Sequence, residues 1–104
     1  MPSKYRNIPT EVEGRIFESK REAVRYQELR MLERSGIITE LRCQVPFNLD
    51  VNGVHICKYL ADFTYSGRDG RLVVEDVKGV RTTVYRIKAK LMIACHALRI
   101  VEVQ

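Results

Sequence analysis

Two strand-like runs, residues 59–65 and 72–78, constrain the fold of this chain more than any other part of it. Both are rich in β-branched, aromatic and other apolar residues, and each has the length of a single strand. The residues between them, Ser-Gly-Arg-Asp-Gly at 66–70, favour a tight turn. We therefore expect the two runs to pair as neighbouring strands.

Each run carries a carboxylate, Asp62 in the first and Asp76 in the second, and Lys78 follows two residues after Asp76. Because strand side chains alternate between faces, Asp76 and Lys78 project to one side and Glu75 to the other. Strand pairing can then bring both aspartates and the lysine to one point. Carboxylate oxygens, water and a backbone carbonyl, that of Val77, suit Mg²⁺, and a neighbouring lysine can orient an attacking water. This combination favours a divalent-metal site for phosphodiester cleavage.

A helix is predicted upstream of these strands, between Ser19 and Gly36. Ser19 and Glu22 fit the S-x-x-E capping box, and the glycine is typical of a helix end. Glu22 also lies on the stripe, with Tyr26 and Leu29, that should pack on the sheet. The Glu22 carboxylate therefore has two interpretations, a capping contact or a third acid of the site, and the pattern alone favours neither.

The other strands follow from turn and periodicity signals. Residues 37–49 predict a strand with an irregularity at Pro46, and the Asn-Gly pair at 52–53 predicts a hairpin into a return strand over 54–65. Residues 98–103 alternate as a last strand.

A second helix is predicted after Gly79, with Thr82 or Thr83 as its N-cap and its end near His96. The apolar stripe expected along this helix consists of Val84, Ile87, Leu91 and Cys95. The order α-β-β-β-α-β predicts an α+β fold with a mixed sheet flanked by helices. The sheet is mixed because a crossover helix lets the last strand run parallel to a neighbour.

The length of 104 residues predicts a single domain. We assign residues 15–104 to this domain and residues 1–14, which carry basic residues and prolines but no periodicity, to a basic N-terminal arm. The net charge of +5 favours a polyanionic partner, although charge alone does not identify nucleic acid.

Composition also bears on the cellular compartment. No apolar run approaches the roughly 20 residues of a membrane span, and the polar N-terminus lacks a signal-peptide core. The three cysteines form no CxxC pair, and their odd number and scatter are typical of reduced thiols with no disulfide partner. We therefore expect a cytoplasmic protein that does not associate with membranes.

Four sequence blocks occur in an order that resembles a known superfamily. They are Phe-Glu-Ser-Lys-x-Glu-Ala at 17–23, Ala-Asp-Phe-x-Tyr at 61–65, Glu-Asp-Val-Lys-Gly at 75–79 and Tyr-x-x-Lys-x-Lys at 85–90. Together with the α-β-β-β-α-β order, they resemble the PD-(D/E)XK nuclease superfamily, whose restriction-endonuclease-like fold is shared with Holliday junction resolvases. More narrowly, they resemble small phage- and prophage-encoded endonuclease-like proteins. One departure is Ala61, which stands where the superfamily pattern has proline.

The resemblance implies a role for each matching residue. Glu22, Asp62 and Asp76 take the positions of the metal-binding acids, and Lys78 that of the catalytic lysine. The implied activity is Mg²⁺-dependent or Mn²⁺-dependent hydrolysis of DNA in recombination, repair or processing. A domain this small would act on a duplex or junction as a homodimer.

Three further residues are expected to contact nucleic acid. Lys88 matches a helix position that contacts phosphate, and Lys20 and Tyr85 belong to the matching blocks at the two helix starts. Gln44 on the first strand can reach the site in the superfamily manner, but we interpret it as an ordinary polar strand residue.

Other interpretations stay open at this stage. The chain can be a catalytically inactive nucleic-acid-binding domain of the same fold, or an interaction module whose acids and lysine form surface pairs. Histidines and cysteines at 55, 57, 95 and 96 match no standard zinc spacing. Tyr59, Phe63 and Tyr65 share a strand face and are interpreted as core under a helix rather than a base-stacking platform.

Overall fold

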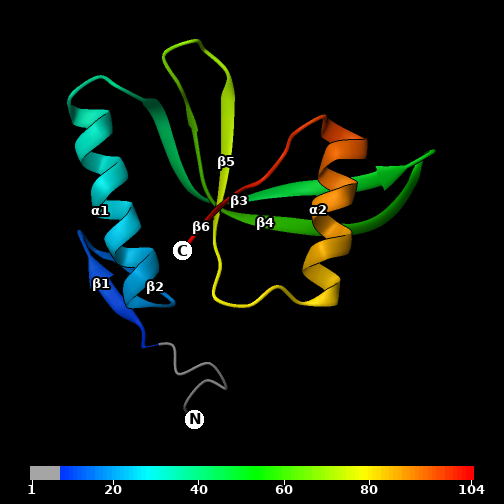
Figure 1. Cartoon of the computed structure of the whole chain (residues 1–104), viewed down its shortest axis with the longest axis horizontal. Coiled ribbons are helices and arrows are strands. Elements are labelled where there is room, and N and C mark those ends of the chain that lie inside the picture. Colours follow the sequence, from blue (N-terminus) through cyan, green and yellow to red (C-terminus); the bar gives the residue numbers. More distant parts are fainter. Residues whose placement is uncertain (1–7) are drawn as a thin grey trace.

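The computed structural model describes residues 8–104, shown in Figure 1. The described elements are β1 (Thr10–Val12), β2 (Arg15–Phe17), α1 (Lys20–Arg34), β3 (Thr39–Val51), β4 (Val54–Ser66), β5 (Leu72–Val77), α2 (Thr83–His96) and β6 (Val101–Val103). Strands β3, β4, β5 and β6 form one sheet in that order, with β6 parallel to β5 and the other pairs antiparallel. The predicted α+β fold with its mixed sheet and two helices is confirmed, and it is compatible with a restriction-endonuclease-like arrangement.

Helix α1 begins and ends where its capping residues predict. The Ser19 side chain accepts a hydrogen bond from the Glu22 amide, and Ser35 is the C-cap. The buried face of the helix includes Glu22, Tyr26 and Leu29, as the apolar stripe predicts. Glu22 therefore lies at the N-terminal end of the face that meets the sheet.

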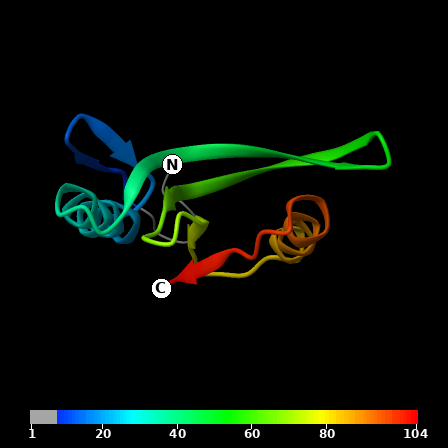
Figure 2. The same cartoon turned by 90° about the horizontal axis from the view of Figure 1, so that it is seen from above.

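The long β3–β4 hairpin extends over both helices, which lie on one side of it (Figure 2). Its turn is the predicted Asn52-Gly53 pair, and both residues adopt the positive φ that a tight hairpin turn requires. Two hydrophobic clusters lie beneath it. Phe63 packs in the cluster that includes α1, whereas Tyr59 packs with Tyr85 and other residues of α2. Tyr59 and Phe63 of β4 are therefore core residues beneath a helix, as predicted, and each lies beneath a different helix.

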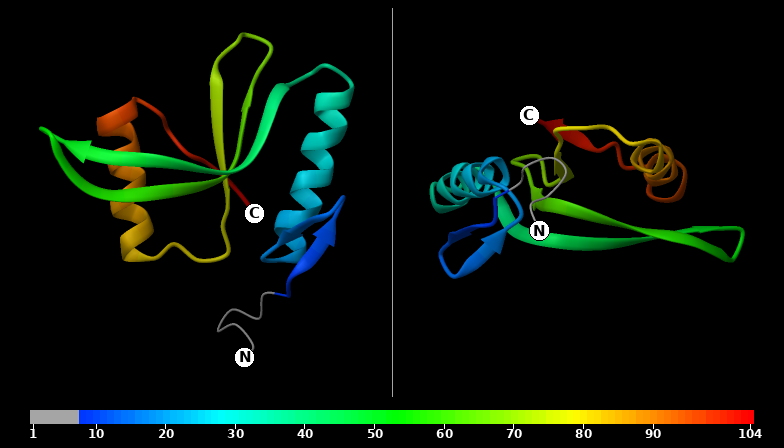
Figure 3. Two further views of the ribbon diagram at one scale, coloured as in Figure 1. Left: turned by 180° about the vertical axis from the view of Figure 1, so that it is seen from behind. Right: turned by 90° about the horizontal axis from the view of Figure 1, so that it is seen from below.

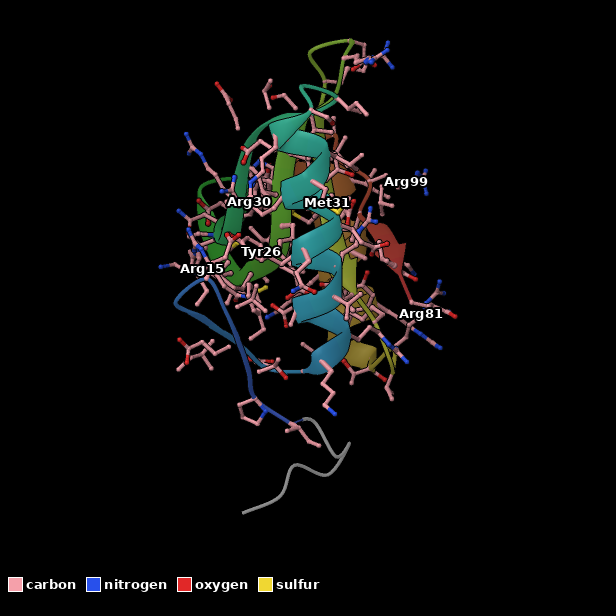
Figure 4. The ribbon with its side chains drawn as sticks, turned by 90° about the vertical axis from the view of Figure 1, so that its left-hand side faces the viewer. Arg15, Tyr26, Arg30, Met31, Arg81 and Arg99 are labelled. Carbon is pink, nitrogen blue, oxygen red and sulfur yellow. The ribbon has the colours of Figure 1, made fainter. Side chains whose placement is uncertain are left out.

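Strands β1 and β2 form a small hairpin that the sequence did not predict. Glu13, at its turn, accepts hydrogen bonds from Tyr26 of α1 at 3.0 Å and from Arg34 at 2.8 Å. Figure 4 shows Arg15, Tyr26 and Arg30 gathered between this hairpin and α1. The assignment of residues 10–14 to an irregular arm is therefore wrong, because paired strands and a carboxylate attach them to the helix. The part of that arm formed by residues 1–7 lies outside the described residues.

Helix α2 begins after its predicted N-cap, Thr82, but its packed face matches the predicted stripe only in part. Leu91 and Cys95 of the stripe pack against the same cluster as the buried Tyr85 and Met92, whereas Val84 and Ile87 are exposed. The stripe is therefore confirmed in its second half and wrong in its first half, where the Tyr85 side chain instead reaches Lys78, just after β5, and Glu102 of β6. Within residues 8–104, neither helix has the length and apolar character that a membrane crossing needs.

Candidate functional site

A cleft of about 680 Å³ opens between the start of α1, the middle of the sheet and the segment that follows β5. All four residues assigned to the candidate site line it, namely Glu22, Asp62, Asp76 and Lys78. They come from α1, β4, β5 and the position directly after β5, and are separated by up to 56 positions in sequence, from 22 to 78. The fold therefore brings the predicted residues together.

The register of β4 against β5 places the two aspartates side by side. Phe63 pairs with Glu75, so Asp62 comes opposite Asp76 on the other face of the two strands. The Asp62 Oδ2 atom accepts a hydrogen bond from the Val77 amide at 2.7 Å. Burial, followed by repulsion from the Asp76 carboxylate, raises the pKa of Asp62 to about 7. The surroundings of Asp62 therefore disfavour the negative charge of its carboxylate.

Asp76 and Lys78 are held by aromatic side chains. The buried Tyr59 hydroxyl donates to Asp76 Oδ2 at 2.6 Å, and Lys78 Nζ lies 3.2 Å from Asp76 Oδ1. The same Lys78 nitrogen lies 4.0 Å from the centre of the Tyr85 ring, a cation–π contact. The Tyr85 hydroxyl in turn donates to Glu102 of β6 at 2.9 Å. Side chains of β4, β6 and α2 thus hold Asp76 of β5 and Lys78, which directly follows β5, in place.

Glu22 faces the same cleft from α1. Its amide caps the helix through Ser19, but its carboxylate accepts a hydrogen bond from Gln44 Nε2 of β3 at 2.9 Å. Burial, and then the negative charges of Glu18 and Asp76, raise the pKa of Glu22 to about 7. Of the two interpretations of Glu22, the geometry favours a side chain directed into the site.

Glu75 lies on the opposite face, as strand alternation predicts. Both of its oxygens bind the Arg25 guanidinium at 2.8 Å, and Tyr65 donates a further hydrogen bond. This buried ion pair attaches α1 to β5. Glu75 is therefore a structural acid and not a member of the cleft.

The three residues expected to contact nucleic acid are placed differently from one another. Lys88 and Tyr85 line a second hollow of about 240 Å³, which shares Asp76 and Lys78 with the cleft. Lys20 is exposed at the start of α1 and lines neither hollow among the described residues. Tyr85 is largely buried, with its hydroxyl bound to Glu102 and its ring against Lys78. That Tyr85 contacts nucleic acid stays a prediction.

Two site residues were missed by sequence reasoning. Tyr59 was interpreted only as core, yet its hydroxyl is the partner of Asp76. Gln44 was interpreted as an ordinary polar residue, yet it holds Glu22 and adopts a left-handed φ of 53°. The sign that Gln44 belongs to the site is its position opposite Asp62. That position follows only from the register of β3 against β4, which the sequence alone does not give.

The residues of the cleft fit a hard divalent cation held by few protein ligands. Among residues 8–104, no three His, Cys, Asp or Glu side chains are gathered closely enough to hold a metal ion between them. Mg²⁺ does not need such a group, because it is usually bound by one or two carboxylates, waters and substrate phosphates. Asp62, whose pKa is raised, and the adjacent Asp76 supply such a pair of carboxylates, and Val77 borders the cleft with them.

The raised pKa values predict a stability that depends on pH when divalent ions are absent. An acid whose pKa is higher in the folded protein binds more protons there, so stability falls as pH rises through the window from about 4 to about 7. In EDTA we expect the free energy of unfolding to be lower at about pH 8 than at about pH 5, by on the order of 2 kcal/mol. Urea unfolding at both pH values measures this difference.

The control is the double variant Glu22→Gln and Asp62→Asn, which removes both groups whose pKa is raised to about 7. Its unfolding should depend much less on pH in this window. A wild-type protein that is equally stable at both pH values, or a variant that keeps the full dependence, would contradict the prediction. Millimolar Mg²⁺ should restore stability to the wild type at the higher pH, because a ligand of the folded state stabilises it.

Comparison with known proteins assigns the chain to a family. Residues 2–101 match the model of a family described as protein of unknown function (DUF1064), and the chain belongs to this family. Searches of the curated proteins and of the solved structures found no match.

Proposed function

We propose that the protein is a metal-dependent nuclease that hydrolyses DNA phosphodiester bonds. The observation that carries the proposal is the convergence of Glu22, Asp62, Asp76 and Lys78 in one cleft. The resemblance of the four sequence blocks to the PD-(D/E)XK nuclease superfamily supports it independently. A cytoplasmic location is part of the proposal, supported by three cysteines that are all free thiols in the structure.

Each residue of the cleft has a chemical task in this proposal. Asp62, Asp76 and the Val77 carbonyl would hold Mg²⁺ or Mn²⁺, with Glu22 reaching the same ion or a second one. The ion supplies a more acidic bound water and offsets charge on the scissile phosphate. Lys78, held at the mouth of this group, orients the attacking water and stabilises the developing negative charge.

Outside the ligand set, the neighbouring side chains have positioning tasks. Tyr59 and Gln44 keep the Asp76 and Glu22 carboxylates aimed into the cleft. Tyr85 keeps the Lys78 ammonium beside Asp76. Such locked side chains are what catalysis by preorganised charges requires. To cut both strands of a duplex, two copies of this small domain would have to act together.

The test is cleavage of single-stranded, duplex and branched DNA with Mg²⁺, with Mn²⁺ and with EDTA. We expect cleavage with either ion and none with EDTA, and calorimetry should show Mn²⁺ binding that Asp62→Ala abolishes. Absence of both cleavage and ion binding would overturn the proposal. If salt-sensitive DNA binding then remained, and Asp62→Ala bound equally well, the inactive DNA-binding alternative would hold instead.

A further inference from the structure

Arg21 is an exposed arginine of α1 that lines the cleft and has no task in the proposed chemistry. The charged residues that line the cleft are Glu18, Arg21, Glu22, Asp62, Asp76 and Lys78. Of the two basic residues among them, Lys78 is paired with Asp76. Arg21 forms no ion pair within residues 8–104, so its positive charge is available to an anion that the protein does not itself supply.

The other arginines of α1 are all paired with carboxylates. Those at positions 25, 30 and 34 form ion pairs of 2.6–2.8 Å with Glu75, Glu33 and Glu13. Arg21 has no carboxylate partner in the part of the chain that the structure describes, although Glu18 and Glu22 line the same cleft. The lack of a partner is therefore a feature of this position and not of the helix as a whole.

A single hydrogen bond holds the Arg21 side chain. Its Nη1 atom donates to the Lys78 carbonyl at 3.3 Å, slightly longer than the usual N–H···O range of roughly 2.7–3.2 Å. The contact forms because the start of α1 lies beside the segment that leaves β5 (Figure 3). The Nε–Nη2 edge of the guanidinium has no hydrogen-bond partner among residues 8–104. Two N–H groups of this kind match two oxygens of a phosphate.

The space beside the guanidinium is open. Gly79 follows Lys78 and also lines the cleft. A Cβ atom at this position would lie 3.8 Å from Arg21 Nη1 and, apart from its neighbours in the chain, would meet no other atom of residues 8–104 within 4 Å. A ligand oxygen can therefore reach Arg21 beside Gly79 without displacing another side chain.

Three basic residues follow one another across the two hollows. Arg21 lines the cleft, Lys88 lines the smaller hollow, and Lys78 lines both. Lys78 therefore connects the other two. Lys88 is the residue that the sequence predicts to contact phosphate, and Arg21 is its counterpart in the cleft. A nucleic-acid strand carries a negative charge at each phosphate, which a series of basic residues like this one matches.

The charge of the cleft favours a further cation beside an anionic substrate. Among the residues that line it, acids outnumber bases by two. This excess repels a phosphate, and the repulsion is stronger where protein partly replaces water. In the proposed mechanism a divalent ion offsets the charge beside Asp62 and Asp76. The Arg21 guanidinium can offset it at the neighbouring phosphate.

We infer that Arg21 binds the phosphate next to the scissile one, on the side of the cleft formed by α1. Its guanidinium donates two hydrogen bonds to this phosphate, while Lys78 acts at the scissile one. The inference rests on the proposed nuclease function, because it adds a substrate contact to the same site.

The test measures DNA binding in EDTA, so that it does not depend on cleavage. A labelled duplex and a labelled single strand of equal length are titrated with the full chain by fluorescence anisotropy at several salt concentrations. The test variants are Arg21→Met, which removes the charge, and Arg21→Lys, which keeps the charge but not the paired N–H groups. The matched control is Arg68→Met. Arg68 is exposed in the turn between β4 and β5, at the other end of β5 from Lys78, and lines neither hollow.

We expect Arg21→Met to weaken binding about 10-fold, because hydrogen bonds between charged groups are lost. Both probes should be affected, since a phosphate contact carries no information on sequence. The slope of log affinity against log salt should become shallower by about 0.9 on the duplex and about 0.7 on the single strand, the values of one phosphate contact. Arg21→Lys should keep the wild-type slope and only part of the affinity.

Two further measurements serve as controls. Arg68→Met should change the affinity less than about 2-fold, because salt screens a charge that contacts no phosphate. Urea unfolding should show wild-type stability for Arg21→Met, since this exposed side chain makes one long hydrogen bond within residues 8–104.

Four outcomes would overturn the inference. The first two are a wild-type protein that binds neither probe, and an unchanged salt slope for Arg21→Met. The third is an equal change for Arg68→Met, which would show that any exposed arginine has this effect. The fourth is a loss of stability without a loss of affinity, which would make Arg21 a tether between α1 and the end of β5.

Cleavage by the wild type with Mg²⁺ tests the nuclease separately. If the protein cleaves DNA and Arg21→Met keeps the wild-type slope, the nuclease stands and this contact is refuted. If the protein never cleaves but the slopes change as expected, the nuclease is refuted and the contact stands.

Discussion

Replacing Asp76 with asparagine should lower the rate of DNA cleavage by about 10²–10⁴-fold. The substitution preserves the size of the side chain and an oxygen for the Tyr59 hydroxyl, while it removes the negative charge beside Lys78. Lys78→Met should cause a loss of similar size, because it removes the positive charge that stabilises the developing phosphate charge. Single-turnover rates with Mg²⁺ at saturating protein measure both effects.

The matched control is Asp69→Asn, in the turn between β4 and β5. Asp69 is an exposed aspartate that accepts a hydrogen bond from the Arg71 amide and is not among the residues that line the cleft. The Asp69→Asn protein should cleave DNA at the wild-type rate. Asp76→Asn should also bind DNA in EDTA at least as tightly as the wild type, because a negative charge facing phosphate has been removed. An Asp76→Asn protein with wild-type cleavage would show that the activity resides elsewhere.

Local patterns were sufficient to predict most of the fold. Helix α1 could be predicted from its Ser19 cap, and the β3–β4 hairpin from its Asn-Gly turn, because both signals act over a few residues. Strand alternation separated Asp76 from Glu75 without knowledge of any partner. Those two acids do lie on opposite faces, one in the cleft and one bound to Arg25.

Features that depend on distant contacts could not be predicted in this way. In the first turns of α2 the packed side chain is Tyr85, which contacts both Lys78 and Glu102. The pattern of hydrophobic residues along the helix does not indicate these two contacts. The β1–β2 hairpin is attached to α1 by Glu13, which contacts three residues of that helix. The partners Tyr59 and Gln44 depend on strand register and on a left-handed backbone, neither of which is a local property.

Arg25→Met should destabilise the protein by about 3–5 kcal/mol, the largest stability effect that we expect. The Glu75 side chain is 1% exposed and accepts two hydrogen bonds of 2.8 Å from Arg25, whose side chain is 23% exposed. Without Arg25, the buried Glu75 carboxylate keeps, among residues 8–104, only the Tyr65 hydroxyl as a side-chain hydrogen-bond partner. Burying a charge that has lost its counter-ion is costly, because water no longer solvates it. Urea unfolding at neutral pH measures the loss.

Two comparisons separate this ion pair from a general effect of lost charge. Arg34→Met removes an arginine that is 60% exposed and bound to Glu13, and it should cost less than about 1 kcal/mol. The double variant Arg25→Met and Glu75→Leu should recover most of the lost stability, since no unpaired charge stays buried. A loss below about 1 kcal/mol for Arg25→Met would contradict the assignment of this pair as the attachment of α1.

The same ion pair should affect the candidate site, although it lies on the other face of β5. It joins the helix that carries Glu22 to the strand that carries Asp76, so a loosened helix would move one acid relative to the other. We therefore expect Arg25→Met to lower cleavage even at temperatures where the protein remains folded. The double variant should regain stability more completely than cleavage, because apolar packing restores the contact without the directional hydrogen bonds that fix the helix. Equal recovery of both would mean that the ion pair acts on stability alone.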